Sequence, residues 1–280
     1  MARKSVFEIL DGEFNYQEEV QRINTLFDRY NCSGRSMREI IDSVFLQWKY
    51  RKTTISTFDL FRALKIDNIS MINSMNEYIT YCEAIINLLL VFDRHADDCW
   101  RYSEEFKRIF ISIVNNVRDS LDKIGYKIYV YEDEEHAIIV ENKPLASEAA
   151  EQINDRSISV KLMEYNRYLL QGNLEEKRSI LKSLADWFEG IRKQLEANNL
   201  SSLASDVGFL LNTFNIRHNN EQGRIKNQYM KTMNDEELEC WYDKAYSLIV
   251  ASIISLEKIK IGKEVNELKK KVDAANKEAK

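Results

Sequence analysis

Residues 72–90 read INSMNEYITYCEAIINLLL, and apolar side chains recur in this stretch every three or four positions. The recurring residues are Ile72, Met75, Tyr78, Ile79, Cys82, Ile85, Ile86, Leu89 and Leu90. This spacing places them on one face of an α-helix, so the stretch predicts an amphipathic helix of about five turns. Residues 106–124 repeat the pattern and predict a second long helix.

The same helical spacing recurs on both sides of this pair. Residues 20–30 and 36–48 predict two shorter helices, the second capped by Ser36. Towards the carboxyl terminus, helices are expected over residues 163–170, 174–195, 203–214 and 238–256. Asn234 or Asp235 is the expected N-cap of the last helix.

The composition agrees with a mainly helical fold. The 280 residues include one proline and eight glycines, and these two residue types are the ones that break or weaken helices. Hydrophobic residues make up 44% of the chain and charged residues 30%, as is typical of folded globular proteins and not of disordered ones. The predicted fold class is all-α, a mainly helical bundle, with one small β-hairpin near the middle of the chain.

The hairpin is predicted where the apolar period changes from three or four to two. Residues 127–131 alternate polar with apolar side chains, the acidic residues 132–135 make a turn, and residues 137–140 give a second β-rich run. Pro144 follows and separates the hairpin from the next helices. The expected organisation is an N-terminal helical bundle (1–125), the hairpin and connector (126–145), a helical domain (146–261) and a lysine-rich tail (262–280).

Charge and hydropathy limit the partners and the location. The formal net charge is −5, so a nucleic acid would have to bind a local basic surface, such as the lysine-rich tail. That tail is more simply interpreted as a solvated helix end. No apolar stretch is long enough to cross a bilayer, and no signal peptide can be drawn. The sequence therefore predicts a cytoplasmic protein that does not insert into a membrane.

Several classes of site find no support in the sequence. Gly-rich phosphate loops, HExxH, GxSxG and protein-kinase motifs do not occur, so no cofactor is expected. His95 has acidic residues and Cys99 nearby, but their spacing matches no known metal site, and no metal is expected. His136 is expected to be exposed in the hairpin turn. The four cysteines lack CxxC spacing and are expected to be buried as small hydrophobic residues.

One polar cluster between two apolar helices stands out as a candidate site. It comprises Asn215, Arg217, His218, Asn219, Asn220 and Arg224. Arginine suits phosphate binding and histidine can transfer protons near neutral pH, and together they are enough for metal-independent RNA cleavage by a neighbouring 2′-hydroxyl. The alternative is an ordinary helix C-terminus. Asparagine and glycine then terminate the helix, and Arg217 and His218 neutralise its dipole.

The cluster and residues 163–177 resemble the C-terminal module of abortive-infection-like bacterial proteins in the HEPN superfamily. The resemblance covers roughly residues 145–260. It implies a four- or five-helix bundle that dimerises and, in active members, cleaves RNA at a site shared across the dimer. The family signature is an arginine, commonly followed by a polar residue, with a histidine four to six residues after the arginine. Arg217 matches the arginine, but residues 221–223 contain no histidine.

This departure leaves two hypotheses open. In the first, the chain is an endoribonuclease of a bacterial defence or toxin system. Arg217 and His218 are then catalytic, and Asn215, Asn219, Asn220 and Arg224 bind the RNA. In the second, it is a non-catalytic interaction or sensor module of such a system, which binds a partner protein or nucleic acid without cleavage. The resemblance implies a homodimer in either case.

Overall fold

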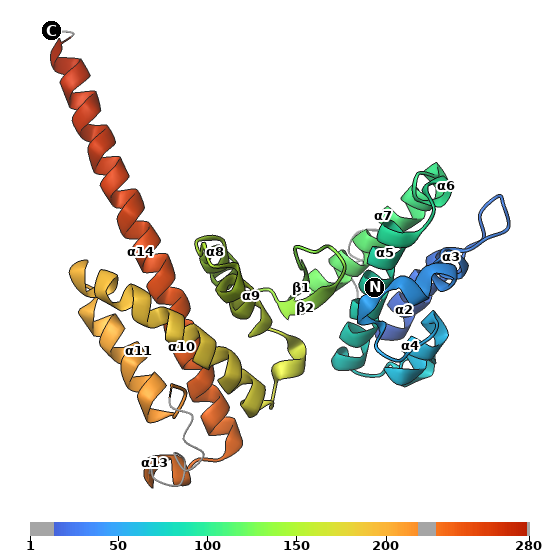
Figure 1. The fold of residues 1–280 in the computed structure, drawn as a ribbon, viewed down its shortest axis with the longest axis horizontal. Coiled ribbons are helices and arrows are strands. Elements are labelled where there is room, and N and C mark those ends of the chain that lie inside the picture. The colour runs from blue at the N-terminus through green and yellow to red at the C-terminus, as the bar shows by residue number, and fades with distance from the viewer. Residues whose placement is uncertain (1–13, 218–227, 279–280) are drawn as a thin grey trace, which may run out of the picture. The chain divides into compact units, whose positions relative to one another are not determined.

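The computed structural model describes residues 14–217 and 228–278, which form two compact units (Figure 1). The first unit runs from Met1 to Asn142 and the second from Lys143 to Lys280. The division lies within the segment 126–145 that the sequence analysis placed between two helical domains. Both units are mainly helical, and one two-stranded antiparallel sheet accompanies the helices of the first, which confirms the predicted fold class.

In the first unit, two long helices and several shorter ones build the core. The helices are α2 (Tyr16–Phe27), α3 (Met37–Val44), α4 (Thr57–Ala63), α5 (Met75–His95), α6 (Asp98–Arg101) and α7 (Glu104–Lys123). Single 3-10 turns occupy Phe45–Gln47, Lys49–Arg51 and Ile69–Met71. The strands are β1 (Tyr126–Val130) and β2 (Ala137–Glu141).

Helix α5 begins at a capping box and is buried along most of its length. The Ser74 side chain accepts a hydrogen bond from the Glu77 amide, and the Glu77 carboxylate accepts one from the Ser74 amide. The predicted stripe of residues 72–90 faces the core, with Tyr78, Ile79 and Ile85 almost inaccessible to solvent. Ser36 likewise caps α3 as predicted, and that helix gives way to a 3-10 turn after Val44.

The hairpin pairs Tyr126 with Glu141 and Val130 with Ala137, and its second strand is anchored to α5 by side chains. Asn87 of α5 donates to the Ala137 carbonyl oxygen (2.8 Å) and accepts from the Ala137 amide (3.0 Å). Glu83 accepts a hydrogen bond from the Ile139 amide (2.8 Å). The backbone groups of Ala137 and Ile139 in these contacts lie on the edge of β2 that is not paired with β1. Because α5 provides their hydrogen-bond partners, the helix stabilises the two-stranded sheet.

The expectation that His136 is exposed was wrong. Its ring lies between Tyr131, stacked at 3.9 Å between ring centroids, and Tyr50, at 4.2 Å, and the imidazole Nδ1 lies 3.1 Å from Asp133. Tyr50 also donates to Asp133, at 2.5 Å. The acidic turn is thus packed against the 3-10 turn Lys49–Arg51, and the two tyrosines leave the His136 side chain 24% exposed.

The cysteines also depart from expectation. Cys82 is buried in α5, but Cys32, Cys99 and Cys240 are exposed. Cys32 lies in the loop after α2, whereas Cys99 and Cys240 lie on outward faces of α6 and of the last helix. A small hydrophobic residue is buried only where the local element faces the core, and a single cysteine carries no pattern that reveals this.

The second unit contains six described helices in residues 143–217 and 228–278. They are α8 (Pro144–Glu151), α9 (Arg156–Glu164), α10 (Leu174–Ala197), α11 (Ser201–Thr213), α13 (Gln228–Lys231) and α14 (Asp235–Glu278), and a 3-10 turn occupies Tyr168–Leu170. Helices α10, α11 and α14 pack against one another, with α8 and α9 beside them. Asn234 caps α14, because its side chain accepts from the Glu237 amide at 2.8 Å.

One predicted helix of this unit is wrong in its extent. Residues 163–170 were expected to be continuous helix, but α9 ends at Glu164 and the 3-10 turn follows separately. Asn166 explains the break: its side chain donates back to the Leu162 carbonyl oxygen (2.9 Å), a local bond that competes with helix continuation. The lysine-rich segment from residue 262, in contrast, continues α14 without interruption to Glu278.

Candidate functional site

Only part of the predicted polar cluster falls within the described residues. Asn215 and Arg217 are described, whereas His218, Asn219, Asn220 and Arg224 lie outside the described residues. The described part of the cluster lies at the end of α11, beside α10.

Asn215 terminates α11 in a Schellman motif. Its φ of 55° is left-handed, a conformation that asparagine tolerates better than most residues. The Asn215 amide donates to the Asn212 carbonyl (3.3 Å), and the Ile216 amide donates to the Leu211 carbonyl (3.0 Å). The helix-terminating role, which was one of the two interpretations of the cluster, thus accounts for the backbone of Asn215.

Two arginines approach this helix end from different elements. Arg178 of α10 donates through Nε to the Asn215 carbonyl oxygen (2.9 Å). The Arg217 guanidinium lies 2.9 Å from Glu189 of α10, and its side chain remains 26% exposed. Arg217 is therefore oriented by a carboxylate but still accessible to a solute, a requirement for any residue that binds an anion from solution.

A polar cluster centred on the buried side chain of Lys177 joins α10 to α14, and it was not predicted from the sequence. The Lys177 ammonium lies 2.8 Å from Glu239 and 2.7 Å from Asp243, and its side chain is only 8% exposed. The Tyr165 hydroxyl donates to Asp243 (2.8 Å), and the Gly172 amide donates to Glu239 (2.9 Å). The acidic partners lie more than sixty positions along the chain from Lys177, so no local sequence pattern could have revealed the cluster.

The charges of this cluster favour the ionised form of Glu239, one of the two carboxylates that contact Lys177. Burial acts to raise the pKa of Glu239, but the hydrogen bonds from Lys177 and from the Gly172 amide outweigh it and hold that pKa below its ordinary value. Burial and the neighbouring Asp243 raise the pKa of Tyr165. With each charge opposed by another at hydrogen-bond distance, the cluster has the properties of a structural clamp.

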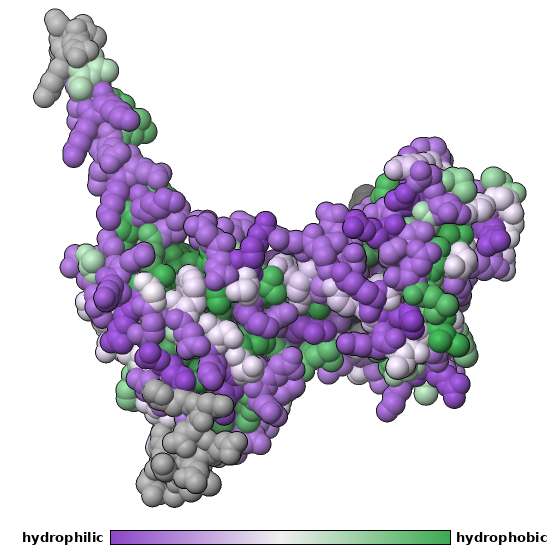
Figure 2. Space-filling view, viewed as in Figure 1, coloured by the Kyte–Doolittle hydropathy of each residue, from purple (hydrophilic) through white to green (hydrophobic). Residues whose placement is uncertain are grey.

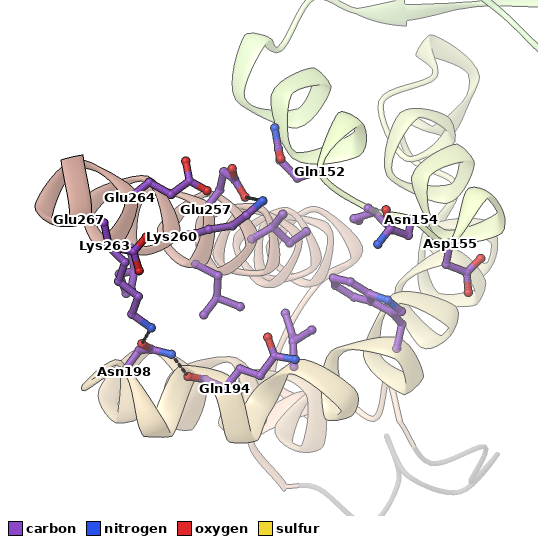
Figure 3. A pocket seen from close by; sticks show the side chains of 16 residues that line it. Gln152, Asn154, Asp155, Gln194, Asn198, Glu257, Lys260, Lys263, Glu264 and Glu267 are labelled. Atoms are coloured by element: carbon purple, nitrogen blue, oxygen red, sulfur yellow. Dashed lines mark hydrogen bonds and ion pairs between the residues drawn. The ribbon is translucent and has the colours of Figure 1, made fainter. Parts of the chain in front are cut away.

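A groove of about 700 Å³ lies elsewhere in the second unit, between α10, α14 and the segment joining α8 to α9 (Figure 3). Its apolar lining includes Trp187, Ile191, Ile253 and Leu256. Polar side chains surround it, and Lys263 of α14 donates to Asn198 at the end of α10 (3.1 Å). None of the predicted site residues that the structure describes lines this groove.

Two further expectations concern metals and membranes. Among residues 14–217 and 228–278, no group of three or more His, Cys, Asp and Glu side chains could hold a metal ion. In the same part of the chain, no helix combines the length and the apolar character needed to cross a bilayer.

Comparison with family models, curated proteins and solved structures found no match for this chain.

Proposed function

We propose that the second unit is a HEPN-like module that binds RNA through Arg217 and cleaves it without a metal ion. The observation that carries the proposal is the position of Arg217: it is partly exposed at the end of α11, held by Glu189, and immediately precedes His218. The packing of α10, α11 and α14 against one another is compatible with the helical bundle that the resemblance to the HEPN superfamily implies, and it supports the proposal to that extent.

In this proposal the protein supplies charge and proton transfer to a reaction internal to the RNA. The 2′-oxygen attacks the adjacent phosphorus, the bond to the 5′-oxygen breaks, and a 2′,3′-cyclic phosphate and a 5′-hydroxyl result. Arg217 stabilises the negative charge on the phosphoryl oxygens. His218 either accepts the 2′-hydroxyl proton or donates one to the leaving 5′-oxygen, and water carries out the other of these two proton transfers. Asn215, whose backbone terminates α11, positions Arg217.

The ion pair between Arg217 and Glu189 leads to a prediction about RNA binding. An RNA phosphate must compete with Glu189 for the Arg217 guanidinium, so removal of the carboxylate charge in Glu189→Gln should tighten binding of single-stranded RNA severalfold at low salt. Arg217→Ala should weaken binding, and the double variant should bind no better than Arg217→Ala. Equal binding by all four proteins would contradict a phosphate-binding role for Arg217.

Cleavage is tested with labelled single-stranded RNA in the presence of a chelator. Arg217→Ala and His218→Ala should each reduce the rate about 100-fold or more, the scale expected for loss of a catalytic charge or proton-transfer group. Lys193→Ala is the matched comparison, because it removes a cation from an exposed position of the same helix α10, and its rate should stay near wild type. Intact RNA with wild-type protein would overturn the nuclease proposal.

A second candidate function, a non-catalytic interaction module, is favoured by the same contacts. The Arg217–Glu189 pair and the Schellman motif at Asn215 account for these residues as structural features. In that case Arg217→Ala lowers the stability of the second unit by up to about 1 kcal/mol, as for a partly exposed ion pair, and leaves RNA binding and cleavage unchanged. Thermal unfolding measured beside the RNA assays separates the two functions.

A further inference from the structure

The last part of α14 carries apolar side chains that no other described element covers. Ile261 is 49% exposed, Val265 44%, Leu268 59% and Val272 49%. In Figure 1 this part of the helix continues beyond the ends of α10 and α11, and Figure 2 shows hydrophobic patches along its otherwise hydrophilic surface. Four large apolar residues left in solvent on one helix are costly unless another surface covers them.

Their spacing is that of a coiled-coil seam. The intervals between Ile261, Val265, Leu268, Val272 and Ala275 are four, three, four and three residues. With Val265 and Val272 as heptad positions a, the residues at d are Ile261, Leu268 and Ala275. A strict a/d stripe is narrower than the apolar face of a helix that packs on a bundle or lies on a membrane, so a single partner helix fits it best.

The seam continues a face that the protein already uses for packing. Ile254, one heptad before Ile261, is 5% exposed, so the same face of α14 is covered in its first half and open in its second. The change from covered to open falls where the helix passes the end of α10, near the contact between Lys263 and Asn198. A partner helix would therefore start at about Ile261.

The charges beside the seam favour a second copy of the same helix. Glu264 occupies position g and Lys269 occupies position e of the following heptad. In a parallel dimer these two positions face each other across the interface, so two copies place Glu264 opposite Lys269 twice, with opposite charges each time. Valine at both a positions, with leucine at the central d position, also favours two parallel strands.

We propose that residues 261–275 of α14 form a parallel two-stranded coiled coil with the same residues of a second copy of this chain. The inference does not rest on the proposed RNA chemistry, because it uses other residues and its test contains no RNA. Since the seam is only about two heptads long, the dimer is weak and depends on protein concentration.

Light scattering coupled to size-exclusion chromatography tests the interface over about a hundredfold range of concentration. Wild type should shift from monomer to dimer, and Leu268→Asp should remain monomeric, with a dissociation constant raised tenfold or more. Asn266→Asp is the matched control, because it introduces the same charge at the exposed position b and should dimerise like wild type. Circular dichroism checks that each variant is folded. A monomeric wild type at every concentration overturns the proposal, as does equal loss of dimer in both variants.

Charge reversal tests the pairing. Glu264→Lys and Lys269→Glu should each weaken the dimer severalfold, because each places like charges opposite one another, and the double variant should restore it. An antiparallel dimer would instead bring Glu264 near Lys271 of the second copy. Restoration by Glu264→Lys with Lys271→Glu, and not by the first pair, would overturn the parallel arrangement.

Discussion

Lys177 shows how one buried charge can hold two helices together. Its ammonium lies between Glu239 and Asp243, so Lys177→Met would leave two carboxylates without their cation. We expect the free energy of unfolding to fall by about 2 kcal/mol, less than for a fully buried pair because Asp243 remains partly exposed. Urea denaturation measures the change, and Lys193→Met, at an exposed position of the same helix, should change it by less than about 0.5 kcal/mol. Equal effects of the two substitutions would show that the clamp contributes nothing.

Glu239 should make the second unit sensitive to acid. Its pKa in the folded chain lies below the ordinary value of 4.5, so the folded state favours the charged form and gains stability above that value. This gain is lost as the pH falls from about 5 through the lowered pKa. Glu239→Gln should therefore be less stable than wild type at pH 7, and the difference should shrink towards pH 3. Glu148→Gln, at an exposed position of α8, should not change the shape of the pH profile.

At the residue scale, the sequence predicted which side chains carry charge at a helix end better than it predicted which side chains they contact. Arg217 was identified as a cation at a helix end, and it is one, but its pairing with Glu189 depends on how α10 packs beside α11. The Lys177 cluster escaped notice for the same reason, since a lysine and an acid on separate helices form no local motif. His136 was expected in solvent because the turn is acidic, yet Tyr50 from a distant segment covers it.

At the element scale, Asn87 anchors the hairpin to α5. It satisfies both backbone groups of Ala137, and all of these atoms are buried. Asn87→Ala should lower the free energy of unfolding of the first unit by about 1–3 kcal/mol, because an amide and a carbonyl would lose their partners away from water. Chemical denaturation measures this loss. Asn76→Ala, at an exposed position of the same helix, should have a much smaller effect, and a comparable one would contradict the anchoring role.

Apolar periodicity predicted most elements because each long helix buries one face. Helices α5, α7, α10 and α11 lie where their stripes placed them, and the change to a period of two located β1 and β2. Helix ends were harder, since they depend on single polar side chains. Asn166 stops α9 early by bonding to Leu162, and α14 extends well past residue 256 because its lysine-rich continuation consists largely of good helix formers.

At the scale of the whole molecule, each of the two units has its own core and its own polar anchor. Asn87 fastens the hairpin within the first, and Lys177 clamps α10 to α14 within the second. A unit with a complete core needs no contact from outside to fold, so the chain is expected to behave as two folding units.

Separate expression of residues 1–142 and 143–280 tests this expectation. Each fragment should unfold cooperatively, with a helical far-UV spectrum and, in the first fragment, a small β contribution from the hairpin. Two substitutions extend the test. Asn87→Ala should lower the free energy of unfolding of fragment 1–142, and Lys177→Met that of fragment 143–280, each by about as much as in the full chain. A fragment that is unfolded alone, or a substitution whose effect disappears in its own fragment, would show that the units depend on each other for stability.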